Sequence, residues 1–291
     1  MFAQLVGDIS GFMYGKLLII MLLAVGFYFT VRTGFIQLRL LGETIRVITE
    51  KPKDKDAVSS FQALMVSTAS RVGTGNIIGV STALCLGGFG SMLWMWLAAF
   101  IGGGAAFAES TLAQIYKKRG ANGSYGGPAY YIQEALGNRF IAVIFALSLI
   151  ATYAVGFNML CAYNLQSTFS NSTFYDKATT PWVIGGILAV LVGWCIFGGG
   201  KRIIKATSTL VPIMGLIYVS VAFVVTLLNI SQLPQVFAAI FSQAFDFDAI
   251  FGGFAGSCVM FGIKRGLYSN EAGVGSAPNA AATASTSHSS S

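Results

Sequence analysis

Seven long apolar stretches alternate with polar links along the chain, and each stretch is long enough to cross a bilayer. A membrane-spanning helix needs about 20 consecutive, mainly apolar residues. In chain order, the stretches cover residues 14–35, 60–87, 91–115, 140–165, 181–199, 207–230 and a last one that starts near 248. No stretch alternates apolar and polar residues over about ten positions, as the strands of an outer-membrane barrel do. The pattern predicts an all-α membrane protein with about seven membrane segments.

The amino-acid composition agrees with a protein embedded in the bilayer. Hydrophobic residues make up 55% of the chain and charged residues only 10%, whereas soluble domains have about 25% charged residues. The first apolar stretch lacks a small-residue cleavage site, so we do not expect it to be a removable signal peptide. The 35 glycines are typical of helices that pack closely through small residues.

Lysine and arginine residues are concentrated in three links, at 32–55, 116–139 and 200–206, and the links between these are almost free of them. Because basic links stay on the cytoplasmic side, this distribution predicts a multi-pass protein of the plasma (inner) membrane with its N-terminus outside. The net charge of +7 then reflects topology rather than binding of nucleic acid. In the second basic link, Ala129–Leu136 is predicted to form a short amphipathic helix at the cytoplasmic interface.

The sequence lacks the residue patterns of catalytic and metal sites. His288 is the only histidine, and the four cysteines lie inside apolar stretches without a CxxC spacing. Such cysteines are typical of buried small hydrophobic residues. A glycine-rich phosphate loop with a following GK[ST] is also missing. We therefore expect no enzyme activity, no cofactor and no resident metal.

The second apolar stretch, Phe61–Leu86, carries polar and glycine residues near its middle, at Arg71, Gly73, Gly75 and Asn76. Glycine is about 1 kcal/mol less favourable than alanine in a helix interior. Backbone groups freed by unwinding are tolerated at membrane depth only where they face protein, ligand or water. Two interpretations follow: the helix is broken here to form a binding site, or the glycines form a close-packing seam between helices.

The last apolar stretch has a similar design, because Ala249–Phe261 leads into Gly262-Ile263-Lys264-Arg265-Gly266. By the charge distribution it enters the membrane from the side opposite to Phe61–Leu86. Two interrupted helices of opposite direction indicate an inverted-repeat transporter with its site at the midplane, so both stretches are predicted to be broken. The chain then divides into a first helix with a basic link (1–59), a five-helix repeat (60–230) and the start of a second repeat (231–291).

Several motifs resemble those of one transporter family. In chain order they are Arg71–Val80 (RVGTGNIIGV), Trp94-Met95-Trp96 with Phe107–Ser110, Gly126–Ile132 (GGPAYYI), Phe197–Arg202 (FGGGKR) and Arg265–Pro278 (RGLYSNEAGVGSAP). They are similar to the signatures of the alanine/glycine:cation symporter family, also called the sodium:alanine symporter family. The resemblance covers nearly the whole chain. It implies a leucine-transporter-like inverted-repeat fold, with sodium-coupled or proton-coupled uptake of a small neutral amino acid such as alanine or glycine.

By position, the resemblance assigns the substrate site to the two breaks. The residues concerned are Gly73, Thr74, Gly75 and Asn76 in the first break and Gly262, Ile263 and Gly266 in the second. Backbone N–H groups freed at Thr74–Ile77 suit a carboxylate. Carbonyl groups freed around Thr68, Ala69 and Val72 suit an ammonium group or Na⁺. The expected partners are a small neutral amino acid, Na⁺ or H⁺ and the lipid bilayer, while the oligomeric state is left open.

Four polar residues near the breaks are interpreted as gate or structural residues: Arg71, Glu109, Asn270 and Glu271. A carboxylate inside a membrane is a functional candidate, and the alternative for Glu109 is an ion pair with Lys117 or Lys118. Arg71 either holds a cytoplasmic gate closed through an acidic partner or extends to the inner surface. Glu271 either contacts a nearby arginine or caps a half-helix.

Two departures from the family pattern affect the expected function. Where the family has a glutamine, in a pattern like GNMVQAN, this chain has Cys161 in GFNMLCAYN, and this residue is included in the expected substrate site. The chain also ends at Ser291, while the family continues through several more helices. The alternatives to a carrier are therefore a truncated, non-transporting membrane fragment and a passive channel. Uptake that requires a Na⁺ gradient distinguishes the carrier from both.

Overall fold

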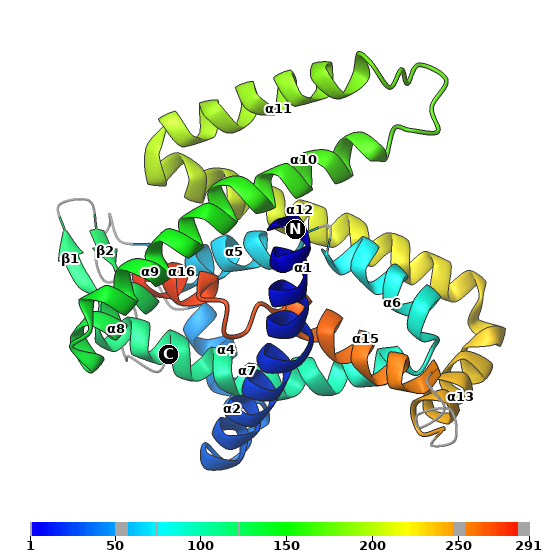
Figure 1. Ribbon diagram of the computed structural model, residues 1–291, viewed down its shortest axis with the longest axis horizontal. Helices are drawn as coiled ribbons and strands as arrows, with labels where there is room; N and C mark the ends of the chain where they lie inside the picture. The colour runs from blue at the N-terminus through cyan, green and yellow to red at the C-terminus, as the bar shows by residue number, and fades with distance from the viewer. Residues whose placement is uncertain (1, 50–57, 74, 121–122, 247–253, 285–291) are drawn as a thin grey trace.

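The structure is a computed structural model that describes residues 2–49, 58–73, 75–120, 123–246 and 254–284 (Figure 1). Within these ranges the fold is mainly helical, with one two-stranded antiparallel sheet. The elements in chain order are α1 (Phe2–Phe12), the π-helix η1 (Met13–Leu17), α2 (Leu18–Arg32), α3 (Ile36–Arg39), α4 (Leu41–Ile48), α5 (Ser60–Arg71), the π-helix η2 (Gly75–Gly79), α6 (Val80–Gly87), α7 (Ser91–Ile115), β1 (Lys118–Gly120), β2 (Gly123–Tyr125), α8 (Pro128–Leu136), α9 (Arg139–Ile150), the π-helix η3 (Ala151–Phe157), α10 (Asn158–Ser167), α11 (Thr180–Phe197), α12 (Gly199–Leu228), the 3₁₀ turn η4 (Ile230–Gln232), α13 (Leu233–Ala244), α15 (Phe254–Asn270) and α16 (Ser276–Thr283).

Among the described residues, five helices are long and apolar enough to cross a membrane. They are Gln4–Arg32, Ser91–Ile115, Arg139–Ser167, Thr180–Phe197 and Gly199–Leu228. Their positions agree with five of the seven predicted stretches, although the first begins well before residue 14 because α1 and η1 extend it toward the N-terminus. The other two predicted stretches are divided into shorter helices, and the predicted start near 248 lies outside the described residues. Seven crossings therefore remain a prediction.

α7 is the central helix of the fold, because α2, α15 and α16 all pack along it (Figure 1). Its contact with α2 is close. A Cβ atom on Gly26 of α2 would lie 2.6 Å from the carbonyl oxygen of Ile101, and a Cβ atom on Gly104 would lie 2.8 Å from the carbonyl oxygen of Gly26. Small residues at a helix contact allow the two backbones to approach in this way.

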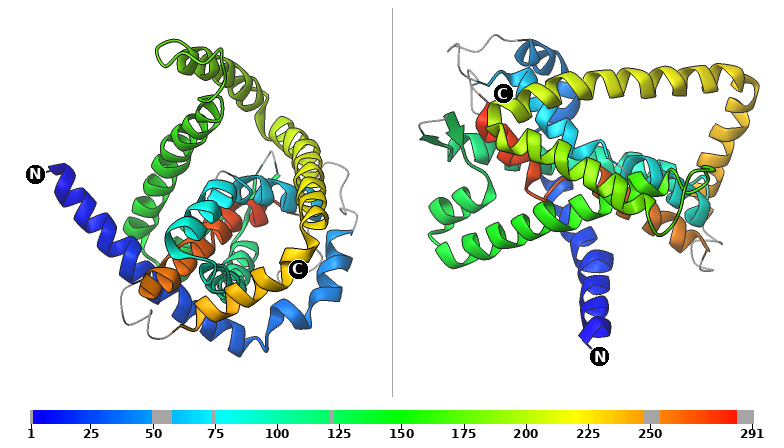
Figure 2. Two further views of the ribbon diagram at one scale, coloured as in Figure 1. Left: turned by 90° about the vertical axis from the view of Figure 1, so that its right-hand side faces the viewer. Right: turned by 90° about the horizontal axis from the view of Figure 1, so that it is seen from above.

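The two interrupted segments lie side by side and run in opposite directions. The first consists of α5, η2 and α6, and the second of α15 and α16. α6 packs against α15 and α5 packs against α16, so the first half of each segment meets the second half of the other (Figures 1 and 2). This pairing brings the two interruptions together.

The helices from α9 to α12 extend beyond this central group (Figure 2). α9, η3 and α10 form one long span, and α11 and α12 follow it. In the most apolar stretch of α11 no residue is buried, and in that of α12 only 6% of the residues are buried. Apolar side chains that face outward are expected where a helix contacts lipid. α12 also packs against α5, which connects this outer layer to the first interrupted segment.

The basic link after α7 folds into a hairpin and a short helix. β1 and β2 pair antiparallel, with Lys118 opposite Tyr125. Pro128 begins α8, where proline is well accommodated because the first helical N–H has no partner, and Gly137 ends it with a φ of 63°. The predicted short helix at Ala129–Leu136 is confirmed, and its location at the cytoplasmic interface stays a prediction. The hairpin is too short to produce a clear sequence pattern and was not expected.

The predicted break between Gly262 and Gly266 is wrong, because α15 continues without interruption to Asn270. A Cβ atom on Gly262 would lie 2.5 Å from the carbonyl oxygen of Ser91, and a Cβ atom on Gly266 would lie 2.9 Å from that of Met95. Residues four apart lie on the same face of a helix. The two glycines therefore form a close-packing seam against α7.

Candidate functional site

The first interruption begins where α5 ends. A capping box starts this helix, and it ends at Arg71, after which the chain leaves helical geometry at Val72 and Gly73. Thr74 lies outside the described residues, and η2 restarts the segment at Gly75. The predicted interruption of this stretch is confirmed.

Asn76 links the two sides of the first interruption. Its side-chain nitrogen donates to the carbonyl oxygen of Arg71 at 2.9 Å, and its backbone N–H donates to the carbonyl oxygen of Gly73 at 3.1 Å. Its side-chain oxygen accepts a hydrogen bond from the hydroxyl of Ser269 on α15. A single polar side chain thus stabilises the bent backbone and attaches it to the second interrupted segment.

Three stacked aromatic rings form a wall beside the first interruption. The rings of Tyr153 and Phe157 on η3 lie 4.9 Å apart between centroids, and Phe157 lies 6.0 Å from the ring of Tyr268 on α15. A Cβ atom on Gly75 would lie only 2.6 Å from the Cε1 atom of Tyr268. Glycine at this position therefore allows the aromatic wall to approach the interrupted backbone.

The second interruption lies between α15 and α16. Positive φ angles occur at Glu271 (51°), Gly273 (76°) and Gly275 (91°), a conformation that glycine adopts readily and that commonly ends helices. A carboxylate oxygen of Glu109 accepts the N–H of Gly273 at 3.0 Å. The side-chain nitrogen of Asn270 donates to a carbonyl oxygen of α7 at 3.2 Å. Both contacts hold the unwound backbone against α7.

Glu271 joins the two interruptions. Only 4% of this residue is exposed. Its Oε2 atom accepts hydrogen bonds from the hydroxyl groups of Ser276 at 2.5 Å, Ser70 at 3.3 Å and Tyr153 at 3.3 Å. These donors belong to α16, α5 and η3, and a buried carboxylate requires such partners because leaving water is costly. Among the described residues, no hydrogen bond from an arginine to this carboxylate is recorded.

Glu109 forms an ion pair with neither of the lysines considered as partners. Lys117 donates to a glutamine side chain at 2.7 Å, and Lys118 pairs with Glu134 at 2.8 Å. Glu109 binds the backbone of the second interruption instead. Arg71 forms no ion pair in the part of the chain that the structure describes, and its Nε atom is buried without a hydrogen-bond partner.

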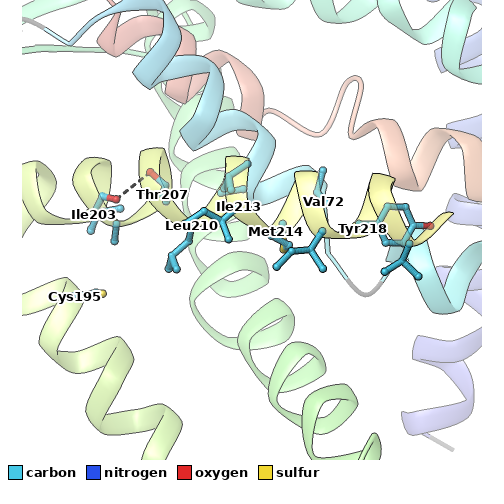
Figure 3. Close-up of a pocket in the computed structure, with 13 residues that line it drawn as sticks. Val72, Cys195, Ile203, Thr207, Leu210, Ile213, Met214 and Tyr218 are labelled. Atoms are coloured by element: carbon cyan, nitrogen blue, oxygen red, sulfur yellow. Dashed lines mark hydrogen bonds between the residues drawn. The ribbon is translucent and has the colours of Figure 1, made fainter. Parts of the chain in front are cut away.

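Two cavities flank the last turns of α5. The larger one, of about 890 Å³, lies between α5, α11 and α12 and is called the apolar cavity below. Figure 3 shows Leu210 and Met214 along α12, with Val72 beside that helix. The hydroxyl of Thr207 donates to the carbonyl oxygen of Ile203 at 3.0 Å. Because the walls are mostly apolar and contain no charged side chain, with the Tyr218 hydroxyl as their other polar side-chain group, the cavity is poorly suited to a zwitterion.

The predicted cation-binding carbonyl groups differ in their surroundings. The carbonyl oxygen of Thr68 accepts the N–H of Val72 at 2.8 Å, which completes the last helical turn. It is therefore not freed by the interruption, contrary to expectation. Ala69 and Val72 both line the apolar cavity.

Three predicted substrate residues lie away from the interruptions. Gly262 and Gly266 belong to the helix seam, and Ile263 packs beside the buried Leu22–Ala98–Leu267 cluster. Cys161 differs from these three, because it is exposed on α10 and close enough to Tyr268 of the aromatic wall to interact with it electrostatically.

The contacts between the interruptions involve five residues that were not expected from the sequence: Ser70, Tyr153, Tyr268, Ser269 and Ser276. The spacing of Tyr153 and Phe157, four residues apart, indicates a stacked pair on one helix face. The contacts of the others join residues that are far apart in the sequence, so only the fold reveals them.

A family model described as "Sodium:alanine symporter family" matches residues 1–291. The chain belongs to this family. Its members couple transport to Na⁺ and need no cofactor, and the family is one of transporters rather than enzymes.

Curated relatives agree with this assignment. The chain is 45% identical over 287 residues to the "Probable sodium/glutamine symporter GlnT" of Bacillus subtilis (strain 168), covering 98% of this chain and 59% of the relative. It is 42% identical to the "Amino-acid carrier protein AlsT" of the same organism, covering 99% of this chain and 61% of the relative. It is 38% identical to the "Sodium/alanine symporter AgcS" of Methanococcus maripaludis, covering 99% and 64%.

The chain spans about three fifths of the length of these relatives. The matches extend over nearly the whole of this chain, and they give no support to the expectation of a truncated, non-transporting fragment. Membership of the family and the apolar helices identify a multi-pass protein of the cell membrane.

Proposed function

We propose that this chain provides the substrate- and cation-binding region of a Na⁺-coupled symporter that takes up a small neutral amino acid by alternating access. The observation that carries the proposal is the meeting of two antiparallel interrupted segments at Glu271. Discontinuous helices whose freed backbone groups meet near the midplane are the usual substrate and ion sites of secondary transporters. The leucine-transporter-like inverted repeat is part of the proposal.

The backbone chemistry of the first interruption favours a zwitterion. A helix N-terminus offers N–H groups to a carboxylate, and η2 starts at Gly75 beside the aromatic wall. The N–H of Asn76, which was expected to be free, already donates to the carbonyl oxygen of Gly73. The end of α5 offers carbonyl groups near Val72 to Na⁺ or to an ammonium group. Gly73, Gly75 and Asn76 bring no charged side chain of their own, and the Glu271 carboxylate at the junction already accepts three hydroxyl hydrogen bonds, so a substrate without net charge is matched best.

The names of the relatives narrow the substrates to be tested. One relative is named for glutamine and another for alanine, and both amino acids are neutral zwitterions. Cys161 replaces an amide of the family motif, so we propose that a small side chain such as that of alanine or glycine is preferred over glutamine. The N-terminus is proposed to lie outside, with the first interrupted segment running from inside to outside.

Uptake by proteoliposomes tests this function directly. The purified full chain is reconstituted, and radiolabelled alanine, glycine and glutamine are each supplied with an inward Na⁺ gradient, a K⁺ gradient or a proton gradient. We expect saturable alanine uptake with the Na⁺ gradient alone, and counter-flow when unlabelled alanine is loaded inside. Flux that does not saturate and needs no gradient would indicate a channel. Intact insertion without Na⁺-dependent binding or uptake would overturn the proposal.

A further inference from the structure

A second cavity, of about 390 Å³, lies between α3, α4, α5, α7 and α16 and is called the polar cavity. Its volume falls in the range of about 300–1,000 Å³ that is typical of small-molecule sites. Its wall includes the polar residues Gln37, Glu43, Ser67, Arg71 and Ser110. It therefore differs in chemistry from the apolar cavity on α12.

Arg71 supplies a positive charge to the polar cavity. It is the last residue of α5, and its Nε atom is buried without a hydrogen-bond partner. Within the described ranges no carboxylate lies within ion-pair distance of Arg71, and Glu109 is close enough to interact with its charge. A buried donor left without an acceptor is unfavourable, and an arginine is well suited to bind a carboxylate through charge-assisted hydrogen bonds.

Gln37 supplies an acceptor to the same cavity. Its Nε2 atom donates to the hydroxyl of Thr30 at 2.8 Å and to the carbonyl oxygen of Phe100 at 3.0 Å. Because the carbonyl oxygen of Phe100 can only accept a hydrogen bond, the atom of the Gln37 amide that faces it must be the nitrogen. The remaining oxygen, Oε1, is buried without a partner. A buried acceptor in this situation is matched by a donor such as an ammonium group.

The other residues of the wall complete the chemistry. Glu43, which pairs with Arg46, adds a negative charge to the wall on α4. Ala63, Ala106 and Ala277 line the cavity with small apolar groups. The wall thus combines a cation, an acceptor without a partner, a carboxylate that pairs with Arg46, and small apolar groups.

We propose that the polar cavity is a second binding site for a zwitterionic amino acid, distinct from the interruptions. Arg71 binds its carboxylate, and Gln37 Oε1 accepts its ammonium group. Ser67 and Arg71 line this cavity, while Ser70 of the same helix contacts Glu271 at the interruptions. The site therefore lies where an amino acid would arrive after leaving the interrupted segments toward the basic links. The inference rests on the proposed function.

Equilibrium binding to the full chain in nanodiscs tests the second site. We expect two components in the binding of radiolabelled alanine, only one of which requires Na⁺. Arg71→Gln and Gln37→Leu should each weaken the affinity of the Na⁺-independent component by about tenfold or more, which is the loss expected for a charge-assisted hydrogen bond. The Na⁺-dependent component should stay unchanged in both variants. Arg39→Gln and Gln232→Leu are matched controls, because neither residue lines the cavity.

Competition by partial ligands tests the zwitterion assignment. Propionate lacks the ammonium group and ethylamine lacks the carboxylate, so each alone should compete weakly for the second component. Strong competition by propionate or chloride would indicate a simple anion site and would overturn the assignment.

A labelling experiment remains decisive if the Arg71 and Gln37 variants do not fold. The thiol introduced by Ser110→Cys lies in the cavity wall, and alanine should slow its reaction with a maleimide even in K⁺ medium. One Na⁺-dependent component, with no protection of this thiol, would overturn the second site and leave the proposed function intact. If the wild-type chain bound no alanine at all, both the second site and the proposed function would be overturned.

Discussion

Gly73–Gly75 and Gly262–Gly266 are two glycine pairs within apolar stretches, and only the first pair coincides with an interruption. Gly73 and Gly75 are two residues apart, so they cannot share one helix face, and a Cβ atom on Gly73 would meet nothing within 4 Å. Gly262 and Gly266 are four residues apart and let α15 approach the backbone of α7. The spacing of the glycines and their neighbours, rather than glycine content, distinguishes a break from a seam.

The second interruption, between α15 and α16, shows the same local pattern. Gly273 and Gly275 are also two residues apart, and the polar residue Ser276 follows them as Asn76 follows the first pair. The contacts of these two polar residues differ: Asn76 binds a serine of α15 in the other segment, whereas Ser276 binds Glu271 within its own segment. A G-x-G pair with a polar neighbour thus occurs in both antiparallel segments, and its unwound backbone is stabilised by side chains from other elements.

The largest effect is expected for Glu271→Ala. The substitution leaves the half-buried hydroxyl groups of Tyr153 and Ser276 without their shared acceptor, whereas the hydroxyl of Ser70 keeps its hydrogen bond to the carbonyl oxygen of Ser67 at 3.0 Å. A hydroxyl left unsatisfied in this way costs about 1 kcal/mol or more, so we expect a loss of about 2 kcal/mol or more in the free energy of unfolding, with loss of alanine binding. Thermal unfolding in detergent and radioligand binding measure the two effects.

Glu271→Gln is the control for this prediction, because its amide oxygen still accepts hydrogen bonds. It should retain most of the stability that the alanine variant loses. Equal stability of the wild type and Glu271→Ala would show that the interruptions do not depend on this carboxylate.

Gly262→Ala and Gly73→Ala compare the seam with the break. A Cβ atom on Gly262 would lie 2.5 Å from the Ser91 carbonyl oxygen, so the helices must separate, and overpacking of this kind costs about 1–3 kcal/mol. Gly73→Ala meets no atom and should change stability by about 0.5 kcal/mol or less. Melting temperatures of the two variants measure the difference. A lower melting temperature for Gly73→Ala than for Gly262→Ala would contradict the distinction between the break and the seam.

The continuous spans could be predicted from the sequence because hydropathy alone marks a helix in lipid. The first interruption was also visible, since Arg71 and Asn76 at mid-depth have no place in a plain apolar helix. The second interruption was predicted at the wrong residues, because Lys264 and Arg265 lie between two glycines and so resemble the sequence pattern of the first interruption. In the fold, the Lys264 ammonium lies 5.9 Å from the centroid of the Tyr14 ring, and Arg265 lies beside Gly79. Neighbouring helices therefore accommodate both charges without unwinding α15.

The polar contacts of the site could not be predicted. Ser70 and Glu271 are 201 positions apart, and Tyr153 and Glu271 are 118 apart. No local pattern connects such residues, because their contact depends on how α5, η3 and α15 pack. The same holds for the polar cavity, whose walls come from five helices.

Gly75 tests how closely the aromatic wall approaches the break. Gly75→Leu should abolish alanine binding without preventing membrane insertion, because its Cβ atom would lie 2.6 Å from the ring of Tyr268. Gly75→Ala should weaken binding by about tenfold, since overpacking by one methyl group costs about 1 kcal/mol or more. Gly79→Ala is the matched control, because its Cβ atom would make an ordinary contact of 3.5 Å with Arg265. Binding that survives Gly75→Leu would place the substrate elsewhere.

The smallest effect is expected outside both interruptions, at the ion pair of Lys118 and Glu134. The hydrogen bond from Lys118 to Glu134, together with the negative charge of Glu134, raises the pKa of the Lys118 ammonium. A raised pKa in the folded state gives a stabilisation that is complete below the ordinary lysine pKa of about 10.4 and lost as the pH rises through the folded value. Glu134→Gln should therefore lower the melting temperature slightly at pH 7 and not at all at strongly alkaline pH. Because exposed ion pairs contribute little, Na⁺-dependent binding should stay unchanged, and a large loss of binding would show that the hairpin is coupled to the interruptions.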